Sequence, residues 1–288
     1  MARYTVDDAS DLMGFLRARA PKTSASEWKK RLKHKAITVN GVPARHDTQL
    51  AVGDVVDTAG GEGPALRANG VEILHADRSI VVIEKPAGLP SVPNDVDDGR
   101  ETALSLARAL LERREKGVRR LFAVHRLDRE TSGVLLLARD IDVRERVMAT
   151  WGEVEKRYVA IVEGHPRERA FSLSLPLREL ANLRVVVGDG PGARDAITHV
   201  TVEATGLTRA RLDVRLETGR KHQIRVSLAH IGHPVVGDET YGAREPGFPR
   251  HALHAAHLAF THPATGERMT FQVPAPAMFA TLLGRRAP

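Results

Sequence analysis

The sequence predicts an α+β protein, with a small N-terminal α/β module and a larger domain built on a mixed, largely antiparallel β-sheet flanked by helices and loops. Three observations support this prediction. Residues 1–57 combine two short helical patterns with short strands, and residues 58–70 are glycine-rich and lack periodicity. From residue 71 onward many strand patterns occur with few helical patterns between them, which disfavours a doubly wound sheet. We therefore expect a module at 1–57, a linker at 58–70 and a second domain at 71–288.

The chain is basic and contains no cysteine. Its 43 lysine and arginine residues outnumber 36 acidic residues, for a net charge of +7, which favours a polyanionic partner. The lack of cysteine excludes disulfides, thiolate metal sites and a cysteine nucleophile. The first residues lack the apolar core of a signal peptide, and no apolar run approaches the roughly 20 residues that cross a bilayer. We expect a cytoplasmic protein with no membrane partner.

The N-terminal module is predicted to contain two helices followed by a hairpin. Leu12, Phe15 and Leu16 recur at helical spacing before Pro21. A second helix, capped by a serine at 24 or 26, turns Trp28 and Leu32 inward and leaves a basic outer stripe. The stripe comprises Lys29, Lys30, Arg31, Lys33 and Lys35. The hairpin follows at 37–42, where an Asn-Gly pair favours a tight turn, and a further strand near 53–56 closes the module.

In the larger domain, the periodicity of apolar residues predicts many strands and a few helices between them. Strands are expected at 72–76, 79–84, 133–138, 157–163, 183–187, 197–204, 210–217, 253–260 and 268–273. Helices are expected at 102–116, 141–151, about 221–231 and from about 276. The run at 134–138 contains only apolar residues, so we expect that strand to be buried.

The most unusual stretch is the polar loop at 125–133, directly before the buried strand. Five of its first six side chains are charged or titratable. Burying such a loop for stability alone is costly, because unpaired buried charge is unfavourable. We infer that a ligand completes its pairing, so that the loop marks a functional site.

This loop, with His-Arg-Leu-Asp at 125–128 and Thr-Ser-Gly at 131–133, resembles the signature of the RluA-type RNA pseudouridine synthases. Further blocks similar to those of the family occur in the family's order at 82–93, 156–164, 218–226 and 231–242. The N-terminal module resembles a small RNA-binding domain named after a ribosomal small-subunit protein, the S-four type. Together the resemblances cover nearly the whole chain.

The resemblance implies the isomerisation of uridine to pseudouridine in RNA, with Asp128 as the essential carboxylate. Arg225 matches the family position that pairs with this carboxylate, and a planar guanidinium suits such pairing. Tyr158 matches the tyrosine that lies beside the flipped base. Arg126 would fill the gap that the extruded base leaves in the RNA. Because the reaction conserves every atom, the resemblance implies no cofactor and no metal.

Other basic residues are candidates for RNA contacts. Arg220 and Lys221 open the helix expected at 221–231 in a basic neighbourhood, and the basic stripe of the N-terminal module would bind phosphates without reading sequence. The family members with such a module favour large-subunit ribosomal RNA as the substrate, and we expect a monomer. A transfer RNA synthase and a non-catalytic RNA-binding or ribosome-assembly protein with the same fold remain alternatives. His251, His254 and His257 suggest a metal site, but their three-residue spacing is not that of helical metal pairs.

Overall fold

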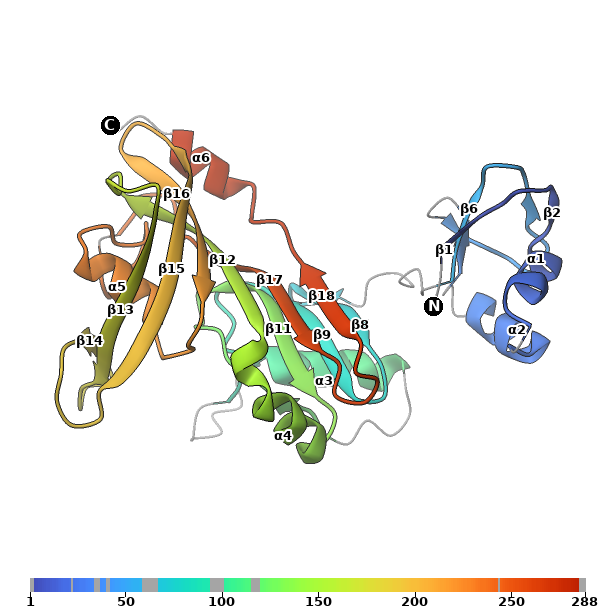
Figure 1. Cartoon of the computed structure of the whole chain (residues 1–288), viewed down its shortest axis with the longest axis horizontal. Coiled ribbons are helices and arrows are strands. Elements are labelled where there is room, and N and C mark those ends of the chain that lie inside the picture. The colour runs from blue at the N-terminus through green and yellow to red at the C-terminus, as the bar shows by residue number, and fades with distance from the viewer. Residues whose placement is uncertain are drawn as a thin grey trace. The chain divides into compact units, whose positions relative to one another are not determined.

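The computed structural model describes residues 3–21, 23–33, 37–39, 42–58, 67–93, 101–114, 120–242 and 244–284. The chain divides into two compact units, residues 1–66 and 67–288 (Figure 1). Each unit has a hydrophobic core of its own.

The N-terminal unit contains two helices and two small antiparallel sheets. Its helices are α1 (Leu12–Arg19) and α2 (Ala25–Lys33). Its strands are β1 (Arg3–Thr5), β2 (Ser10–Asp11), β3 (Thr38–Val39), β4 (Val42–Pro43), β5 (Gln49–Leu50) and β6 (Val55–Asp57). One sheet has the order β1-β6-β3-β4, and β2 pairs with β5. Asp11 caps α1 by accepting a hydrogen bond from the backbone N–H of Gly14, and Ser24 caps α2 through the N–H of Glu27.

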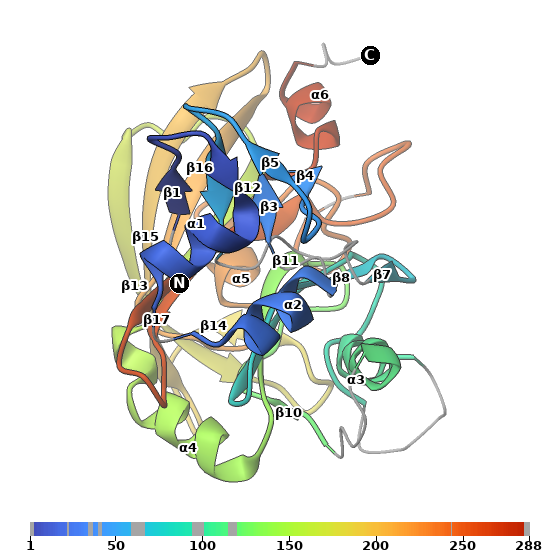
Figure 2. The ribbon, with the colours of Figure 1, turned by 90° about the vertical axis from the view of Figure 1, so that its right-hand side faces the viewer.

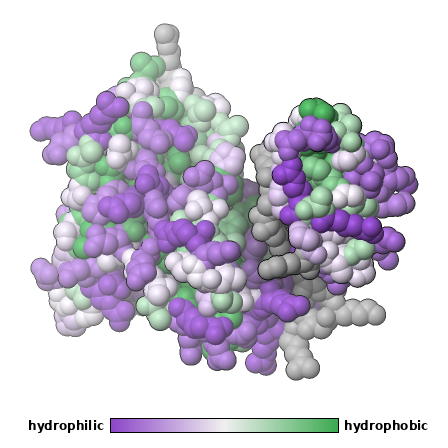
Figure 3. All heavy atoms as spheres, turned by 45° about the vertical axis from the view of Figure 1, so that its right-hand side comes forward, coloured by the Kyte–Doolittle hydropathy of each residue, from purple (hydrophilic) through white to green (hydrophobic). Residues whose placement is uncertain are grey.

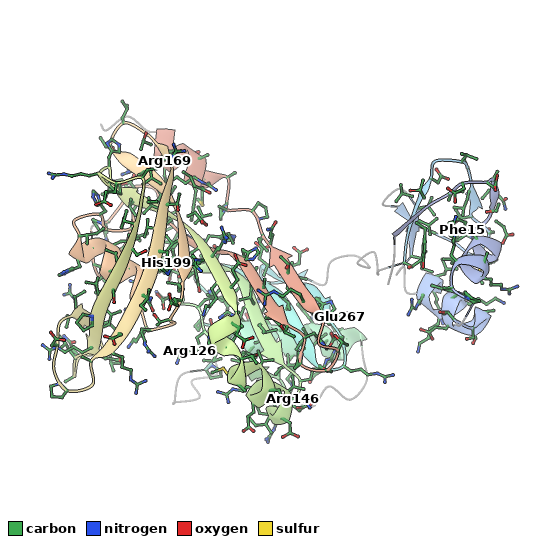
Figure 4. The ribbon with its side chains drawn as sticks, viewed as in Figure 1. Phe15, Arg126, Arg146, Arg169, His199 and Glu267 are labelled. Atoms are coloured by element: carbon green, nitrogen blue, oxygen red, sulfur yellow. The ribbon has the colours of Figure 1, made fainter. Side chains whose placement is uncertain are left out.

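The two helices bury the apolar faces that their spacing predicts. Trp28 and Leu32 are buried in a core with residues of α1. The ring of Phe15, labelled in Figure 4, meets Tyr4 of β1 edge-on. Hydrophilic residues cover much of the surface of this unit (Figure 3). Of the basic stripe, Lys29, Lys30 and Lys33 are exposed, while Arg31 pairs with Glu27 and lies over the Trp28 ring. Lys35 lies outside the described residues.

The larger unit is built on one long sheet. Its strands are β7 (Arg67–Ala68), β8 (Val71–Ala76), β9 (Ile80–Lys85), β10 (Phe122–Ala123), β11 (Ser132–Ala138), β12 (Glu155–Glu163), β13 (Ala170–Glu179), β14 (Val185–Val187), β15 (Arg194–Thr205), β16 (Arg209–Leu216), β17 (Leu253–Thr261) and β18 (Arg268–Gln272). Its helices are α3 (Ala103–Arg114), α4 (Ile141–Ala149), the short 3₁₀ helix η1 (Trp151–Glu153), α5 (Gln223–His230) and α6 (Met278–Gly284).

The sheet runs in the order β14-β13-β15-β16-β12-β17-β11-β9-β8-β7, and β10 and β18 pair with β11 and β17. Within the described residues, β11 and β17 are the one parallel pair and all other pairs are antiparallel. The predicted α+β class and mixed, largely antiparallel sheet are therefore confirmed.

Strand β11 is buried along its whole length, as its apolar run predicts. Helices α3 and α4 lie on opposite faces of this part of the sheet (Figures 1 and 2). Val134 and Leu136 share a core with Val143 and Val147 of α4, and the alternate positions Leu135 and Leu137 point to the other face. Covering on both faces explains why this strand lacks the alternation of a half-exposed one.

Three boundaries differ from the prediction. Strand β13 was not predicted, because Pro176 argues against a strand and every second residue before it is small or polar. The predicted linker at 58–70 overlaps β7, which pairs with β8 through a turn at Asn69 and Gly70, both with positive φ. Helix α5 begins at Gln223 rather than near 221, because His222 adopts a left-handed backbone conformation. Within the described part of the chain, no helix is long and apolar enough to span a membrane.

Candidate active site

The loop before β11 is held in place by side chains from distant segments. The hydroxyl of Ser91 donates to the carbonyl of Leu127 at 2.7 Å and accepts from the N–H of the same residue at 3.0 Å. Thr131 Oγ1 lies 2.8 Å from Nε2 of His251. The loop is thus fixed on both sides of Asp128, which limits the directions in which that carboxylate can point.

Lys85 anchors the same loop through hydrogen bonds to backbone carbonyls. Its side chain is fully buried, and Nζ donates to the carbonyls of Pro86, Leu89 and Arg129 at 2.8, 2.7 and 2.9 Å. Burial lowers the pKa of Lys85 to about 7. The residue therefore joins the segment after β9 to the loop.

Gly133 permits the close approach of β11 and β17. Its φ is +116°, and a Cβ atom there would lie 2.2 Å from the carbonyl oxygen of Ala255. Beside it, Ser132 Oγ lies 2.8 Å from Nδ1 of His254 and accepts from Arg250 at 2.9 Å. The glycine of the Thr-Ser-Gly triplet is therefore required by packing.

Arg225 joins two carboxylates that lie far apart in the sequence. Its Nη1 donates to Oδ2 of Asp128 at 2.9 Å, while Nε and Nη2 donate to Oδ2 and Oδ1 of Asp238 at 2.6 and 2.8 Å. Asp238 is fully buried, whereas the Asp128 side chain is 27% exposed. Burial works to raise the pKa of Asp238, but the hydrogen bonds and charge of Arg225 outweigh it and hold this pKa below its usual range. Asp238 thus fixes the guanidinium that faces Asp128.

An open pocket lies at Asp128. Tyr158 of β12 contributes an aromatic ring, and burial followed by the charge of Asp128 raises the pKa of its hydroxyl. Arg225 and His222 line the pocket as well. The arrangement presents a carboxylate, a cation and an aromatic surface to one bound group.

Of the residues predicted to contact RNA, only some line the pocket. Arg126, labelled in Figure 4, is exposed and lines the pocket. It has no hydrogen-bond or ion-pair partner within the described part of the chain. Arg220 also lines the pocket, and its Nε donates to the carbonyl of Asp195. Lys221 pairs with Glu179 outside the pocket. The basic stripe of α2 belongs to the N-terminal unit.

Three residues of the site were missed by the sequence analysis. The ion pair of Asp238 with Arg225 depends on the tertiary fold. His222 and Tyr241 are joined by a 2.9 Å hydrogen bond beside Asp128. Their positions in the blocks at 218–226 and 231–242 were the available signal, but neither block shows which side chains meet.

The histidines at 251, 254 and 257 do not converge. His251 and His254 hydrogen-bond to Thr131 and Ser132, and His257 lies near Glu155. Within the residues that the structure describes, no group of three or more histidine, aspartate or glutamate side chains is placed to hold a metal ion.

Comparisons with known proteins identify the family. Residues 79–230 match the family model of RNA pseudouridylate synthases. The chain belongs to this family. A relative from Mycobacterium bovis named an uncharacterized RNA pseudouridine synthase is 35% identical, covering 84% of this chain and 83% of its own. A ribosomal large subunit pseudouridine synthase D from Xylella fastidiosa is 32% identical over 91% of this chain and 85% of its own. The predicted family and enzyme class are thus confirmed: the protein is an RNA pseudouridine synthase, an isomerase.

A solved structure supports the same fold. Human RNA pseudouridylate synthase domain containing 4 superimposes with a TM-score of 0.60 at 27% identity, covering 72% of this chain and 90% of its own. The synthase fold therefore accounts for the larger unit, in which the loop at 125–133, β12 and α5 together form the pocket.

Proposed function

We propose that the enzyme isomerises specific uridines of large-subunit ribosomal RNA, with Asp128 as its essential carboxylate. The observation that carries this proposal is the 2.9 Å contact between Arg225 and Asp128 inside a pocket that also contains Tyr158. The relatives named ribosomal large subunit pseudouridine synthase D favour this RNA over transfer RNA.

Each pocket residue has a chemical part in the proposal. The guanidinium of Arg225 keeps Asp128 charged and aimed, while Asp238 holds that guanidinium. The ring of Tyr158 stacks on the extruded uracil, and its neutral hydroxyl stays within reach of the base. Extrusion of a base costs a few kcal/mol. Arg126, without a partner of its own among the described residues, offsets part of that cost by occupying the vacated stack.

The N-terminal module is proposed to bind RNA. Lys29 and Lys33 of α2 line a groove together with Arg45, His46 and the apolar Leu32. A cationic groove of this kind binds phosphates in a salt-dependent manner that carries little sequence information. We propose that residues 1–57 form this module and residues 71–288 the synthase domain of a monomeric, cytoplasmic enzyme that needs neither metal nor cofactor.

The test compares pseudouridine maps of total RNA from cells that carry the active protein, Asp128→Asn or no protein. The proposal expects sites in large-subunit ribosomal RNA that are lost with Asp128→Asn and retained with Asp142→Asn. Asp142 is an exposed carboxylate on α4 and serves as the matched control. If the pseudouridine sites that depend on the active protein lie in transfer RNA, the substrate is transfer RNA and not ribosomal RNA. Full activity of Asp128→Asn would refute the role of Asp128.

A further inference from the structure

His222 has an unusual backbone conformation at the edge of the pocket. It precedes α5 with φ 54° and ψ 16°, in the left-handed region, and its side chain does not cap the helix. Few residues other than glycine adopt this conformation, and those that do are concentrated at functional sites. The imidazole lines the pocket beside Asp128. The conformation therefore directs a ring toward the site instead of stabilising the helix end.

The hydrogen bonds of Tyr241 favour one tautomer of His222. The hydroxyl oxygen of Tyr241 accepts from the N–H of Val185 at 3.1 Å and lies 2.9 Å from Nδ1 of His222. If Nδ1 carried the proton, the hydroxyl proton of Tyr241 would have no acceptor within the described part of the chain. We therefore assign the hydroxyl as the donor to Nδ1. Burial lowers the pKa of His222, so the neutral ring carries its proton on Nε2.

This Nε2–H group faces a carboxylate oxygen, Oδ1 of Asp128, that accepts no hydrogen bond from the described residues. Nε2 of His222 lies 3.9 Å from Oδ1 of Asp128, too far for a direct hydrogen bond. The other oxygen, Oδ2, already accepts from Arg225. The pocket thus presents a donor and an acceptor across a gap. One oxygen atom spans it with two hydrogen bonds of about 2.8 Å that meet at roughly a right angle.

The group that fits this gap must accept from His222 and donate to Asp128. A uracil carbonyl only accepts, and the carboxylate would repel it, while the imide N–H of uracil only donates. A hydroxyl does both. In an internal nucleotide of RNA the 3′ and 5′ oxygens are esterified, so the 2′-hydroxyl is the one hydroxyl available.

We propose that His222 Nε2 and Asp128 Oδ1 together bind the 2′-hydroxyl of the target uridine and make the pocket selective for ribose over deoxyribose. This inference rests on the proposed function, because it takes the pocket as the uridine site. The 2′ carbon is bonded to the sugar carbon whose link to the base is broken and re-formed. Holding the hydroxyl therefore also orients that link toward Asp128.

The test compares the affinities of the protein and its His222 variant for an RNA fragment that contains a mapped target uridine, with ribose or 2′-deoxyribose at that nucleotide. Both RNAs are measured in a Tyr158→Phe background, which slows turnover. We expect the ribose RNA to bind about fivefold to tenfold more tightly, as one or two hydrogen bonds allow. His222→Asn should reduce this preference to about twofold. Asparagine suits both the left-handed conformation and the position before a helix, so the fold is preserved, as circular dichroism would check.

The matched control is His230→Asn, at an exposed histidine at the end of α5, which should keep the full preference. An equal preference in His222→Asn, or no preference with His222 present, overturns the inference. Failure of the proposed function is a separate result, namely the absence of pseudouridine from the mapped RNA.

A second measurement needs no RNA. Nitrogen-15 NMR of histidine-labelled full-length protein at neutral pH should show the Nε2–H tautomer for His222, assigned by its disappearance in His222→Asn. Tyr241→Phe should shift part of the population to the Nδ1–H tautomer and lower the ribose preference. A predominant Nδ1–H tautomer in the unaltered protein would contradict the proposed donor.

Discussion

Arg225 is shared by two carboxylates, and the structure predicts different consequences when each is neutralised. Asp128→Asn should abolish isomerisation with little loss of stability, whereas Asp238→Asn should impair both. Asp238 is fully buried and holds Arg225 through two hydrogen bonds, while Asp128 is 27% exposed and holds it through one. Asp238 also accepts from the N–H groups of Thr240 and Tyr241 at 3.0 and 3.3 Å.

These contacts set the expected magnitudes. Removing one partner of a buried ion pair costs about 3–5 kcal/mol, because the remaining charge is left uncompensated. The guanidinium of Arg225 is 7% exposed, so Asp238→Asn should lower the free energy of unfolding by about 3 kcal/mol. A partly exposed pair contributes about 1 kcal/mol or less, which is the loss expected for Asp128→Asn.

The pKa of Asp238 sets how the stability difference between the unaltered protein and Asp238→Asn changes with pH. The pKa of Asp238 lies below its unfolded value of about 3.9. The ionised carboxylate therefore contributes its full stabilisation above that value, and the contribution is lost as the pH falls through the folded pKa. The stability gap between the unaltered protein and Asp238→Asn should close below about pH 4.

Urea unfolding can measure these stability losses if the fluorescence signal comes from the larger unit alone. Trp151 lies in that unit and Trp28 in the other, so Trp151 fluorescence is followed in a Trp28→Phe background. Asp142→Asn is the control, with a midpoint expected to be unchanged. Equal stability losses for Asp128→Asn and Asp238→Asn, or full activity of Asp238→Asn, would refute the reasoning.

Three further predictions concern other parts of the chain. Gly133→Ala should lower the free energy of unfolding by about 3 kcal/mol or more, since its Cβ would lie 2.2 Å from the Ala255 carbonyl oxygen; an unchanged urea midpoint would contradict this. Burial lowers the pKa of His254 to about 4, below about 6.5 when unfolded, so stability falls as the pH drops between these values. His254→Gln should reduce that slope by up to about 1.4 kcal/mol per pH unit, measured by urea unfolding across the range. Replacing Lys29 and Lys33 by glutamine should flatten the plot of log affinity for RNA against log salt by about 1.4, and an unchanged slope would place RNA binding elsewhere.

Local patterns carried much of the fold and part of the site. The apolar run at 134–138 predicted a buried strand, and β11 is buried at every position. Trp28 and Leu32 predicted the buried face of α2. The prediction failed at β13, where Pro176 and small polar residues obscure a strand that only its pairing with β15 defines. Strand pairing is a long-range interaction, and a local pattern does not contain it.

By itself, the sequence determined the residue types of the site, their order and the presence of a polar loop before a buried strand. The polar loop and the buried strand follow from composition and periodicity over a few neighbouring residues, whereas the site residues follow from the resemblance of the sequence blocks to those of the family. The tertiary structure decided which side chains meet: Asp238 holds the arginine that faces Asp128, and Tyr241 orients the ring of His222. Such contacts join segments from different strands and loops, and their geometry exists only after the sheet has brought those segments together.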